Sequence, residues 1–228
     1  MRLTRRVRLL FMFAHIHIPG ITIHEKPEAV HVQSREMLMT LSSSFFGGGF
    51  RRVRHILNAN VPADYCSGAP DADLRAIAAR CGVTDPFVGL LTAVPLRKAR
   101  IVFFGEGGLR VGALVTAGVS NATSAGVSRP CESRPGTINI ILLLDAKLTR
   151  SAMMNAIITA TEAKCAVLNE MDIRTPDGGL ATGTSTDTVT VAMTGSGPTQ
   201  PYAGPATVVG WLIAKAVRQA IRESLLAG

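Results

Sequence analysis

Alternating apolar and polar residues predict two β-hairpins in the first half of the chain. Residues 21–32 alternate around a turn at Lys26–Pro27, as the two arms of a hairpin do. Residues 100–105 and 110–118 form a second pair of extended runs, and the two glycines between them suit a tight turn. A further short strand is expected at residues 37–41. These segments favour a sheet that is largely antiparallel.

Helical signals lie between and after these strands. Residues 149–169 are predicted to form a long helix, and residues 205–226 a closing helix. Residues 70–80 are expected to be helical because acidic side chains stand in the first turn. Residues 84–91 are predicted to form a helix, because a capping residue precedes a proline that fits the first turn. Residues 50–60 are predicted to begin as a helix and to become extended.

The apolar run at residues 137–144 predicts a strand that is buried on both faces. With the long helix and an expected strand at residues 188–193, it would form one β-α-β unit. Hairpins with interspersed helices favour an α+β fold, in which a mixed, largely antiparallel sheet is layered with helices. A doubly wound α/β sheet is the alternative. Residues 21–228 contain no internal repeat and no linker, so one domain is expected.

Composition permits a large core and argues against nucleic acid as a partner. The chain is 47% hydrophobic but only 5% aromatic, so small aliphatic side chains must provide most of the packing. The formal net charge is +8, yet residues 1–55 hold nine Lys and Arg against three Asp and Glu. The remainder of the chain is therefore close to neutral. No basic stripe is interleaved with aromatic residues, as nucleic-acid binding would favour.

The N-terminal segment and the cysteines predict a reduced, cytoplasmic protein. Residues 1–20 are expected to be a poorly ordered basic extension, because their apolar run is too short to span a bilayer and no clean cleavage site follows it. No membrane partner is therefore expected. The four cysteines are scattered without a Cys-x-x-Cys pair, which indicates reduced and mostly buried thiols. No Cys/His group has zinc spacing, so neither a metal nor a cofactor is predicted.

The long helix carries a candidate acid or base. Glu162 falls beside a broad apolar stripe that includes Ile158 and Leu168. The Ala-rich face with Lys164, almost its only charge, is predicted to meet solvent. Because the helix is apolar on most sides, we expect Glu162 to be semi-buried, and such a carboxylate suits general acid–base chemistry. The alternative is a glutamate that pairs with a cation or reaches solvent. The solvent face predicted in this way consists of Met153, Ala156, Ala160, Ala163 and Val167.

Three loops contain small or polar residues that suit a binding pocket. The glycine run 47–49 lets the backbone approach a ligand, although the lysine of a phosphate-binding loop is missing after it. Asn121, in a Ser/Thr/Asn loop, offers an amide that could hold an oxyanion. Residues 182–187 supply hydroxyls and end in Asp187, which could orient a histidine or activate water. Each loop has a local alternative, in which its side chains only satisfy their own backbone or form a turn.

His55 is the candidate imidazole base, since no histidine follows it and the others lie at or before His31. An exposed histidine on a basic segment is an equally good interpretation. No Gly-x-Ser-x-Gly elbow and no recognisable Ser-His-Asp spacing is present.

Several sequence blocks in a fixed order resemble the adenosylcobinamide amidohydrolase family, over roughly residues 38–226. The resemblance implies hydrolysis of the amide between a corrin propionate and aminopropanol, which gives adenosylcobyric acid and aminopropanol for corrinoid salvage. Some relatives also process pseudocobalamin. The corrinoid would be the substrate and not a cofactor, and a homo-oligomer is possible. The blocks are LSSSFFGGGF at 41–50, RHILN at 54–58, VTAGVSNA at 115–122, GTINI at 136–140, NAIITATEAK at 155–164, ATGTSTD at 181–187 and YAGPAT at 202–207.

On this resemblance we assign hypothetical roles to residues. Glu162 or His55 would be the acid or base, Asp187 would orient or assist it, and Asn121 or a loop N–H would hold the oxyanion. The attacking group would be water, or the hydroxyl of Thr184 or Ser185. A corrinoid carrier without catalysis and a glycine-loop nucleotide enzyme are the two rival functions. The residues expected to bind the substrate are Ser43, Gly47, Gly48, Gly49, Thr116, Asn139, Thr159, Thr182 and Ser185.

Overall fold

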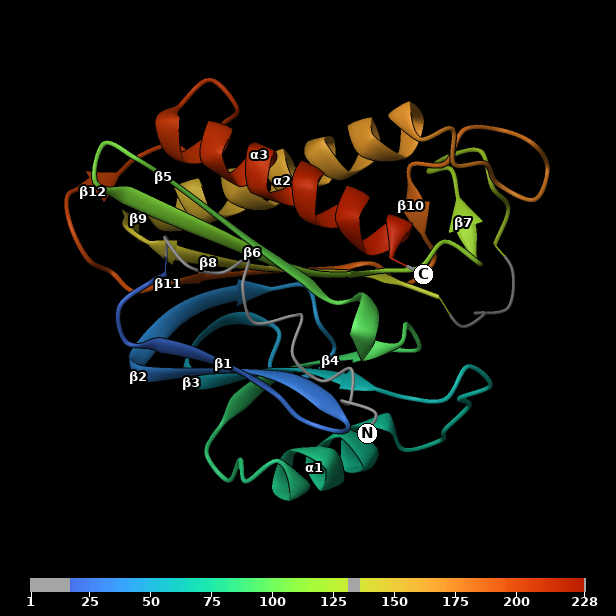
Figure 1. The fold of residues 1–228 in the computed structure, drawn as a ribbon, viewed down its shortest axis with the longest axis horizontal. Helices are drawn as coiled ribbons and strands as arrows, with labels where there is room; N and C mark the ends of the chain where they lie inside the picture. Colours follow the sequence, from blue (N-terminus) through green and yellow to red (C-terminus); the bar gives the residue numbers. More distant parts are fainter. Residues whose placement is uncertain (1–16, 131–135, 228) are drawn as a thin grey trace, which may run out of the picture.

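The computed structural model describes residues 17–130 and 136–227 and contains one large mixed sheet with three α-helices (Figure 1). Eight strands form the sheet in the order β4-β3-β2-β11-β8-β6-β5, with β1 paired to β2. These strands are β1 (Ile21–Glu25), β2 (Ala29–Ser42), β3 (Gly49–Asn60), β4 (Phe87–Thr92), β5 (Arg100–Glu106), β6 (Leu109–Ala117), β8 (Ile138–Asp145) and β11 (Thr188–Met193). The α-helices are α1 (Pro70–Arg80), α2 (Arg150–Glu170) and α3 (Val208–Leu226), with one 3-10 turn at Leu96–Lys98.

The predicted α+β class is confirmed. Within the main sheet only the pairs β3–β4 and β8–β11 are parallel, and its other ladders are antiparallel. The pair β8–β11 with α2 between its strands is the predicted β-α-β unit. Four two-residue strands form small ladders outside the main sheet: β7 (Ala122–Thr123) with β10 (Gly183–Thr184), and β9 (Lys147–Leu148) with β12 (Thr199–Gln200).

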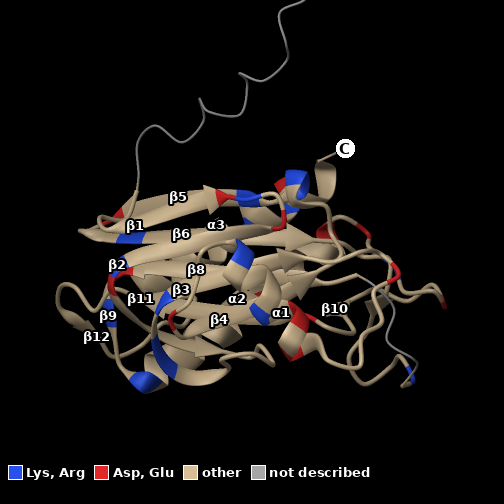
Figure 2. Cartoon of the chain, turned by 90° about the horizontal axis from the view of Figure 1, so that it is seen from below, with Lys and Arg blue, Asp and Glu red and all other residues tan. Residues whose placement is uncertain are grey.

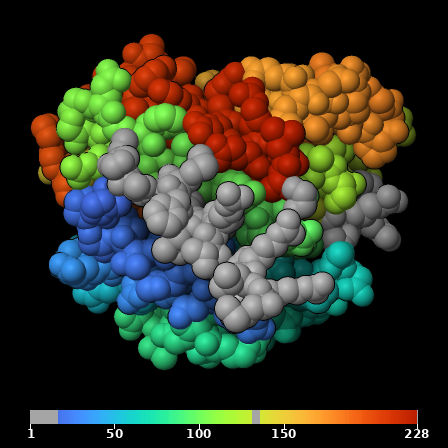
Figure 3. Space-filling model, viewed as in Figure 1, coloured from blue at the N-terminus to red at the C-terminus, as the bar shows by residue number. Residues whose placement is uncertain are grey.

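The sheet bends over so that its two halves face each other (Figure 1). Helices α2 and α3 cover the half with β5, β6, β8 and β11, while α1 lies against the half with β2, β3 and β4. A space-filling view shows the same division, with the C-terminal elements on one side and the N-terminal strands on the other (Figure 3). A core cluster between the halves joins Ile56 and Leu90 to Ile141 and Leu143.

Strand β8 shows why the bent sheet needs an uninterrupted apolar run. Ile140 and Leu142 belong to the core beneath α2 and α3. Ile141 and Leu143 alternate with them and point into the core between the two halves. Both faces of this strand are therefore buried, as the sequence predicts.

Helix α2 is buried on the face that the sequence pattern assigns to solvent. Ala156, Ala160 and Ala163 pack into the main core, whereas Ile158 is 54% exposed. Small side chains allow the helix to approach the sheet and α3 closely. The alanine face therefore packs densely in the core although each side chain is small. The prediction for this helix was wrong about its orientation, and Lys164 turns inward with the alanines.

Two further segments differ from prediction. Residues 87–92 form β4 and not a helix, because they pair in parallel with β3. Gly89 shows the constraint, since a Cβ there would lie 2.3 Å from the Leu74 side chain on α1. Strand β3 is extended along its whole length, so the predicted helical start at residue 50 was wrong. Its exposed arginines lie in the first half of the strand, before the ladder with β4 begins at His55.

The ordered fold begins before residue 21. Ile18 is 1% exposed and packs in the core between the sheet halves, so the predicted extension is too long at its C-terminal end. Residues 1–16 lie outside the described residues. Cys66 is exposed and Cys81 and Cys165 are half-buried, which corrects the expectation of mostly buried thiols for the cysteines that the structure describes.

No helix in the described ranges is long and apolar enough to cross a membrane. Lys and Arg occur on several separate elements in the view of Figure 2 and do not form one continuous band there.

Candidate functional site

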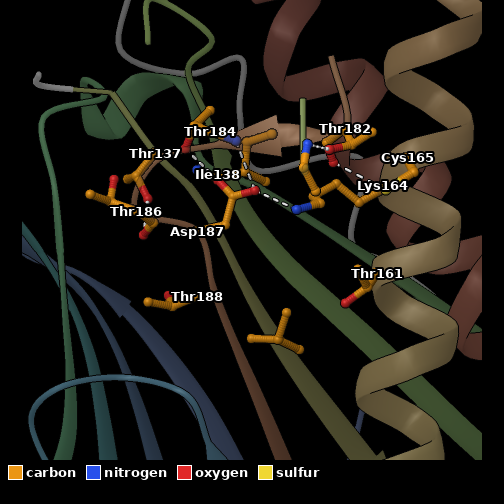
Figure 4. Close-up of polar contacts among 12 residues, drawn as sticks. Thr137, Ile138, Thr161, Lys164, Cys165, Thr182, Thr184, Thr186, Asp187 and Thr188 are labelled. Carbon is orange, nitrogen blue, oxygen red and sulfur yellow. Dashed lines mark hydrogen bonds and ion pairs between the residues drawn. The ribbon is translucent and has the colours of Figure 1, made fainter. Parts of the chain in front are cut away.

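Asp187 is the centre of a compact polar cluster (Figure 4). One carboxylate oxygen, Oδ1, accepts hydrogen bonds from the Thr184 hydroxyl and from the backbone N–H of Ile138, the latter at 3.0 Å. The other oxygen, Oδ2, accepts from the Lys164 ammonium and from the backbone N–H of Thr184, the latter at 3.1 Å. The side chains of Asp187 and Lys164 are 13% and 9% exposed. The carboxylate is thus held from a strand, a helix and its own loop.

Local structure explains how residues so far apart in sequence meet. Asp187 directly precedes β11, and Ile138 begins the parallel neighbour β8, so both lie at the same end of the sheet. Lys164 reaches this end from α2, which connects the two strands. Thr184 is fixed by the short β10–β7 ladder, which pairs it with Ala122. The polar cluster therefore sits at the amino end of the central β-α-β unit.

Asn121 and Ser185 form a second group beside the first. The Asn121 amide donates to the Ser185 hydroxyl at 2.8 Å and to the carbonyl of Gly136 at 2.7 Å. The Thr186 hydroxyl also donates to the Gly136 carbonyl, at 2.8 Å. Ser185 and Thr186 are exposed, whereas Asn121 is buried. The structure thus brings together Asn121, Thr184, Ser185 and Asp187 as the sequence predicted, although their catalytic roles stay a prediction.

Thr182 ties the same loop to its surroundings. Its hydroxyl accepts from the backbone N–H of Ala125 at 2.9 Å, and its carbonyl accepts from the Cys165 thiol at 3.1 Å. Its position beside the cluster is that of a loop anchor. Lys164 and Cys165 were not among the predicted site residues, and the lone charge on an alanine-rich helix face was the signal that could have identified Lys164.

Asn139 and Thr116 belong to a buried network between the sheet halves, which the Thr137 and Thr188 hydroxyls join to the Asp187 loop by donating to Asn139 Oδ1 at 3.1 and 2.8 Å. The Asn139 amide donates to the Asn58 side-chain oxygen at 2.9 Å and to the Leu91 carbonyl at 2.8 Å. The Asn58 amide donates to the Thr116 hydroxyl at 2.9 Å. These three polar side chains are at most 1% exposed. A satisfied buried network specifies packing, so Thr116 and Asn139 join the two halves, and a substrate contact through either of them stays a prediction.

Thr159 and the glycine run also have structural explanations. Thr159 is 1% exposed, and its hydroxyl donates to the Ala203 carbonyl at 2.9 Å, which fastens α2 to the segment before α3. This position does not suit a substrate contact. Gly47 has a φ of +69°, and a Cβ there would lie 2.4 Å from the Phe87 carbonyl oxygen, so glycine is required by the turn itself. With Gly48 it belongs to the connection between β2 and β3, and Gly49 begins β3.

Ser43 is exposed at the end of β2. Its hydroxyl accepts from the backbone N–H of Val189 at 3.0 Å, and its own N–H donates to the Val189 carbonyl at 3.1 Å. It therefore reaches the start of β11, two residues beyond Asp187. A substrate contact through Ser43 and Gly47–Gly49 stays a prediction.

Glu162 does not join the cluster. It is exposed on α2, and none of the hydrogen bonds or ion pairs found among residues 17–130 and 136–227 involves its carboxylate. The predicted semi-burial was wrong because the helix turns its alanine face inward. Lys164, two residues further along, points toward Asp187 instead.

We expect Glu162→Gln to leave turnover close to the wild-type value, because an exposed carboxylate outside the cluster has no means of moving a proton there. Steady-state release of the product amine would measure it, with Glu223→Gln on α3 as a control for a helical glutamate outside the cluster. A large fall in kcat for Glu162→Gln alone would return Glu162 to the site.

His55 lies on the opposite face of β3 from the buried network of Asn58, because side chains three positions apart on a strand point to opposite faces. Its Nδ1 is 3.0 Å from Nε2 of His31, and its Nε2 is 3.9 Å from the Asp85 carboxylate. Burial lowers the pKa of His55, which Asp85 partly offsets and Arg54 reinforces. The structure therefore places His55 in an imidazole pair on β2 and β3, outside the Asp187 cluster.

The imidazole pair is expected to make stability fall in acid. Burial, with the nearby His55, His24 and Lys26, lowers the pKa of His31 from 6.5 to about 4. Between these values the unfolded chain binds more protons than the folded chain, so the free energy of unfolding decreases as pH falls through this window. The full shift corresponds to about 3 kcal/mol.

Urea unfolding midpoints measured from neutral pH down to mild acid would test this. We expect His31→Leu to flatten the decline in stability, and His17→Gln, which removes an exposed imidazole outside the pair, to leave it unchanged. An equally steep decline in His31→Leu would show that other groups cause it.

Other features of the described residues do not compete with the Asp187 cluster as a reaction centre. A hollow of about 380 Å³ lies at the β5–β6 turn and is lined by Gly105, Glu106 and Arg110 among others. Arg110 pairs with Asp145 at the far end of β8 from Ile138, so this hollow is remote from Asp187. Within the described ranges no group of three or more His, Cys, Asp or Glu side chains is placed to hold a metal ion.

The Asp187 cluster has the parts that hydrolytic enzymes use. The Thr184 hydroxyl donates to a carboxylate, which is the pairing that a hydroxyl nucleophile and its proton acceptor require. A cation on the second carboxylate oxygen fixes that acceptor. Thr184 is 9% exposed, whereas Ser185 and Thr186 next to it are open to solvent. Hydroxyl, carboxylate and ammonium are thus grouped beside an exposed loop, and a reactive role for the Thr184 hydroxyl stays a prediction.

Comparison with known proteins agrees with this class of site. A family model described as adenosylcobinamide amidohydrolase matches residues 15–228. An adenosylcobinamide amidohydrolase of Methanosarcina mazei is 36% identical over 192 residues, which cover 80% of this chain and 88% of the relative. One of Halobacterium salinarum is 34% identical over 199 residues, covering 80% of this chain and 78% of the relative. The chain therefore belongs to the adenosylcobinamide amidohydrolase family, enzymes that cleave a carbon–nitrogen bond.

Solved structures were also compared. A Burkholderia β-aminopeptidase superposes with a TM-score of 0.49 at 15% identity, over 92% of this chain and 85% of that one.

Proposed function

We propose that this enzyme hydrolyses the amide that joins aminopropanol to the corrin ring of adenosylcobinamide, and that it releases adenosylcobyric acid and aminopropanol. Membership of the family supports an amidohydrolase that acts on adenosylcobinamide. The observation that carries the assignment of the site is the Thr184 hydroxyl, which donates to Asp187 beside the Lys164 ammonium. No other described carboxylate combines a hydroxyl donor, a buried cation and two backbone donors.

In the proposed reaction Thr184 Oγ1 attacks the carbonyl carbon of the amide, and its proton passes to Asp187. The tetrahedral intermediate then collapses, the carbon–nitrogen bond breaks, and Asp187 returns the proton to the departing amine. Adenosylcobyric acid is left as an ester on Thr184. Water attacks this ester while Asp187 accepts a proton from it, and Thr184 regains its hydroxyl as the acid is released.

The exposure of the loop suits the shape of this substrate. The scissile amide lies on a flexible side arm, which can enter toward the nearly buried Thr184 while the broad corrin stays outside. The exposed hydroxyls of Ser185 and Thr186 stand at the entrance, where they can bond the carboxamides at the corrin edge. The buried Asn121 amide donates to the Ser185 hydroxyl and so holds it in place.

Mass-resolved chromatography of adenosylcobinamide incubated with the purified protein tests the proposal. We expect adenosylcobyric acid and aminopropanol to appear in equal amounts. Pseudocobalamin in a parallel reaction tests the wider substrate range implied by the resemblance. Retention of unchanged adenosylcobinamide on a folded protein, with no amine released, would refute hydrolysis and favour a corrinoid carrier.

A further inference from the structure

Lys164 is a buried cation that neither its helix nor the fold requires. Its side chain is 9% exposed on the alanine-rich face of α2. Taking an ammonium out of water is costly unless a partner compensates it, and a buried ion pair is often no more stabilising than apolar side chains of the same volume. A leucine or methionine would pack beside these alanines without that cost. The presence of lysine therefore calls for an explanation other than stability.

Asp187 does not need Lys164 to hold its loop. The backbone N–H groups of Ile138 and Thr184 each donate to one of its two oxygens, so both oxygens are already fixed to the main chain. What the ammonium adds is charge on the Oδ2 side, opposite the oxygen that receives the Thr184 hydroxyl. A cation in that place holds Oδ2 and so keeps Oδ1 directed to the hydroxyl.

The loop is shaped to admit the lysine. A Cβ at Gly183 would lie 2.4 Å from Asp187 Oδ2 and 2.6 Å from Lys164 Nζ. Gly183 is buried, and its pairing with Thr123 in the β10–β7 ladder places it beside the ion pair. Only a residue without a side chain allows the two charged groups to meet there.

We propose that Lys164 is a positioning residue of the hydrolytic site, which keeps the Asp187 carboxylate aimed at Thr184 without touching the substrate. The inference rests on the proposed function and adds a residue to it. It predicts that loss of the ammonium lowers kcat and leaves KM nearly unchanged, because the entrance residues Ser185 and Thr186 are not altered. An ammonium supplied from solution should then restore part of the lost activity.

The test compares Lys164→Met, Lys164→Arg and Lys164→Ala with Arg110→Met. Arg110 donates to Asp145 at 3.2 Å at the opposite end of β8, so its variant removes a cation–carboxylate pair outside the site. Lys164→Ala removes the atoms from Cγ to Nζ, which propylammonium matches in length and charge. Turnover is measured for each variant with and without propylammonium, and circular dichroism confirms that each is folded.

We expect kcat of Lys164→Met and Lys164→Ala to fall by roughly 100-fold or more, in the range found for residues that support proton transfer. Propylammonium should raise kcat of Lys164→Ala in a saturable way and leave Lys164→Met and Asp187→Asn unaffected. Arg110→Met should retain wild-type turnover. Wild-type kcat in Lys164→Met, or a folded Lys164→Ala that propylammonium does not restore, would overturn the role of Lys164. Absence of turnover in the wild type would instead refute the proposed function.

Discussion

Asp187→Asn should lose at least about 1,000-fold in kcat, because the substitution removes the proton acceptor of Thr184 while it preserves the size of the side chain. The asparagine can keep one oxygen as an acceptor for Ile138 N–H, so the loop retains part of its anchor. Aminopropanol release from adenosylcobinamide, followed at saturating substrate, measures the effect. KM is expected to change much less than kcat, since Asp187 is not at the exposed entrance.

Asp145→Asn is the matched control for this variant. Asp145 is the last residue of β8, whereas Asp187 stands just before β11. Asp145 accepts from the Thr194 hydroxyl at 3.0 Å and from Arg110 at 3.2 Å. It therefore has the same kinds of partner at the opposite end of the central strands. Turnover near the wild-type value is expected. Equal losses in the two variants would mean that Asp187 acts through stability alone.

Stability and catalysis can also be separated within the site. Asp187→Asn leaves Lys164 buried without its carboxylate, and an uncompensated buried charge typically costs about 3–5 kcal/mol. The double variant Asp187→Asn/Lys164→Met removes that charge as well. We expect it to recover most of the lost melting temperature while it remains inactive. Recovery of both properties would contradict a catalytic role for the carboxylate.

Much of the fold follows from local pattern, and the errors arise where distant contacts decide. The hairpins, the central strand β8 and helix α1 were predicted because their turns, apolar runs and acidic first turn are local signals. Residues 84–91 contain a proline and a capping residue that suit a helix equally well. Parallel pairing with β3 makes their second half a strand, and that pairing is not visible in the segment itself.

The orientation of α2 could not be read from periodicity. This helix is apolar on most sides, so its larger side chains gave no reliable direction. The face with Ala156 and Ala160 is buried because both the sheet and α3 approach it closely. The same inversion exposed Glu162 and turned Lys164 inward. One mistake about a helix face thus misplaced one expected site residue and concealed another.

The loop residues were predicted more accurately than the helix residues. Asn121, Thr184, Ser185 and Asp187 meet because the β7–β10 ladder and the parallel pair β8–β11 bring their loops to one end of the sheet. Their residue types alone indicated a polar pocket. The same types also occur at Thr116 and Asn139, where the bent sheet buries them between its halves. Sequence type therefore indicated polarity, and only the three-dimensional fold shows which of these polar groups are buried between the halves.

Thr184→Ala is expected to abolish turnover, with a loss of about 1,000-fold or more, if its hydroxyl is the attacking group. Thr184→Ser keeps a hydroxyl at the same position and should retain measurable activity. Thr194→Ala provides the control, because the Thr194 hydroxyl donates to Asp145 outside the cluster, and it should leave kcat unchanged. The three variants distinguish a nucleophile from a hydroxyl that merely satisfies a carboxylate.

A covalent intermediate is the decisive observation for Thr184. Rapid acid quenching of the wild type during turnover, followed by peptide mass analysis, should reveal adenosylcobyrate esterified to the peptide that contains Thr184. Thr184→Ala should give no such peptide. If Thr184→Ala keeps a substantial fraction of the wild-type rate and the wild type forms no ester, water is the nucleophile. Asp187 would then take its proton from that water, and Thr184 would serve only to orient the carboxylate.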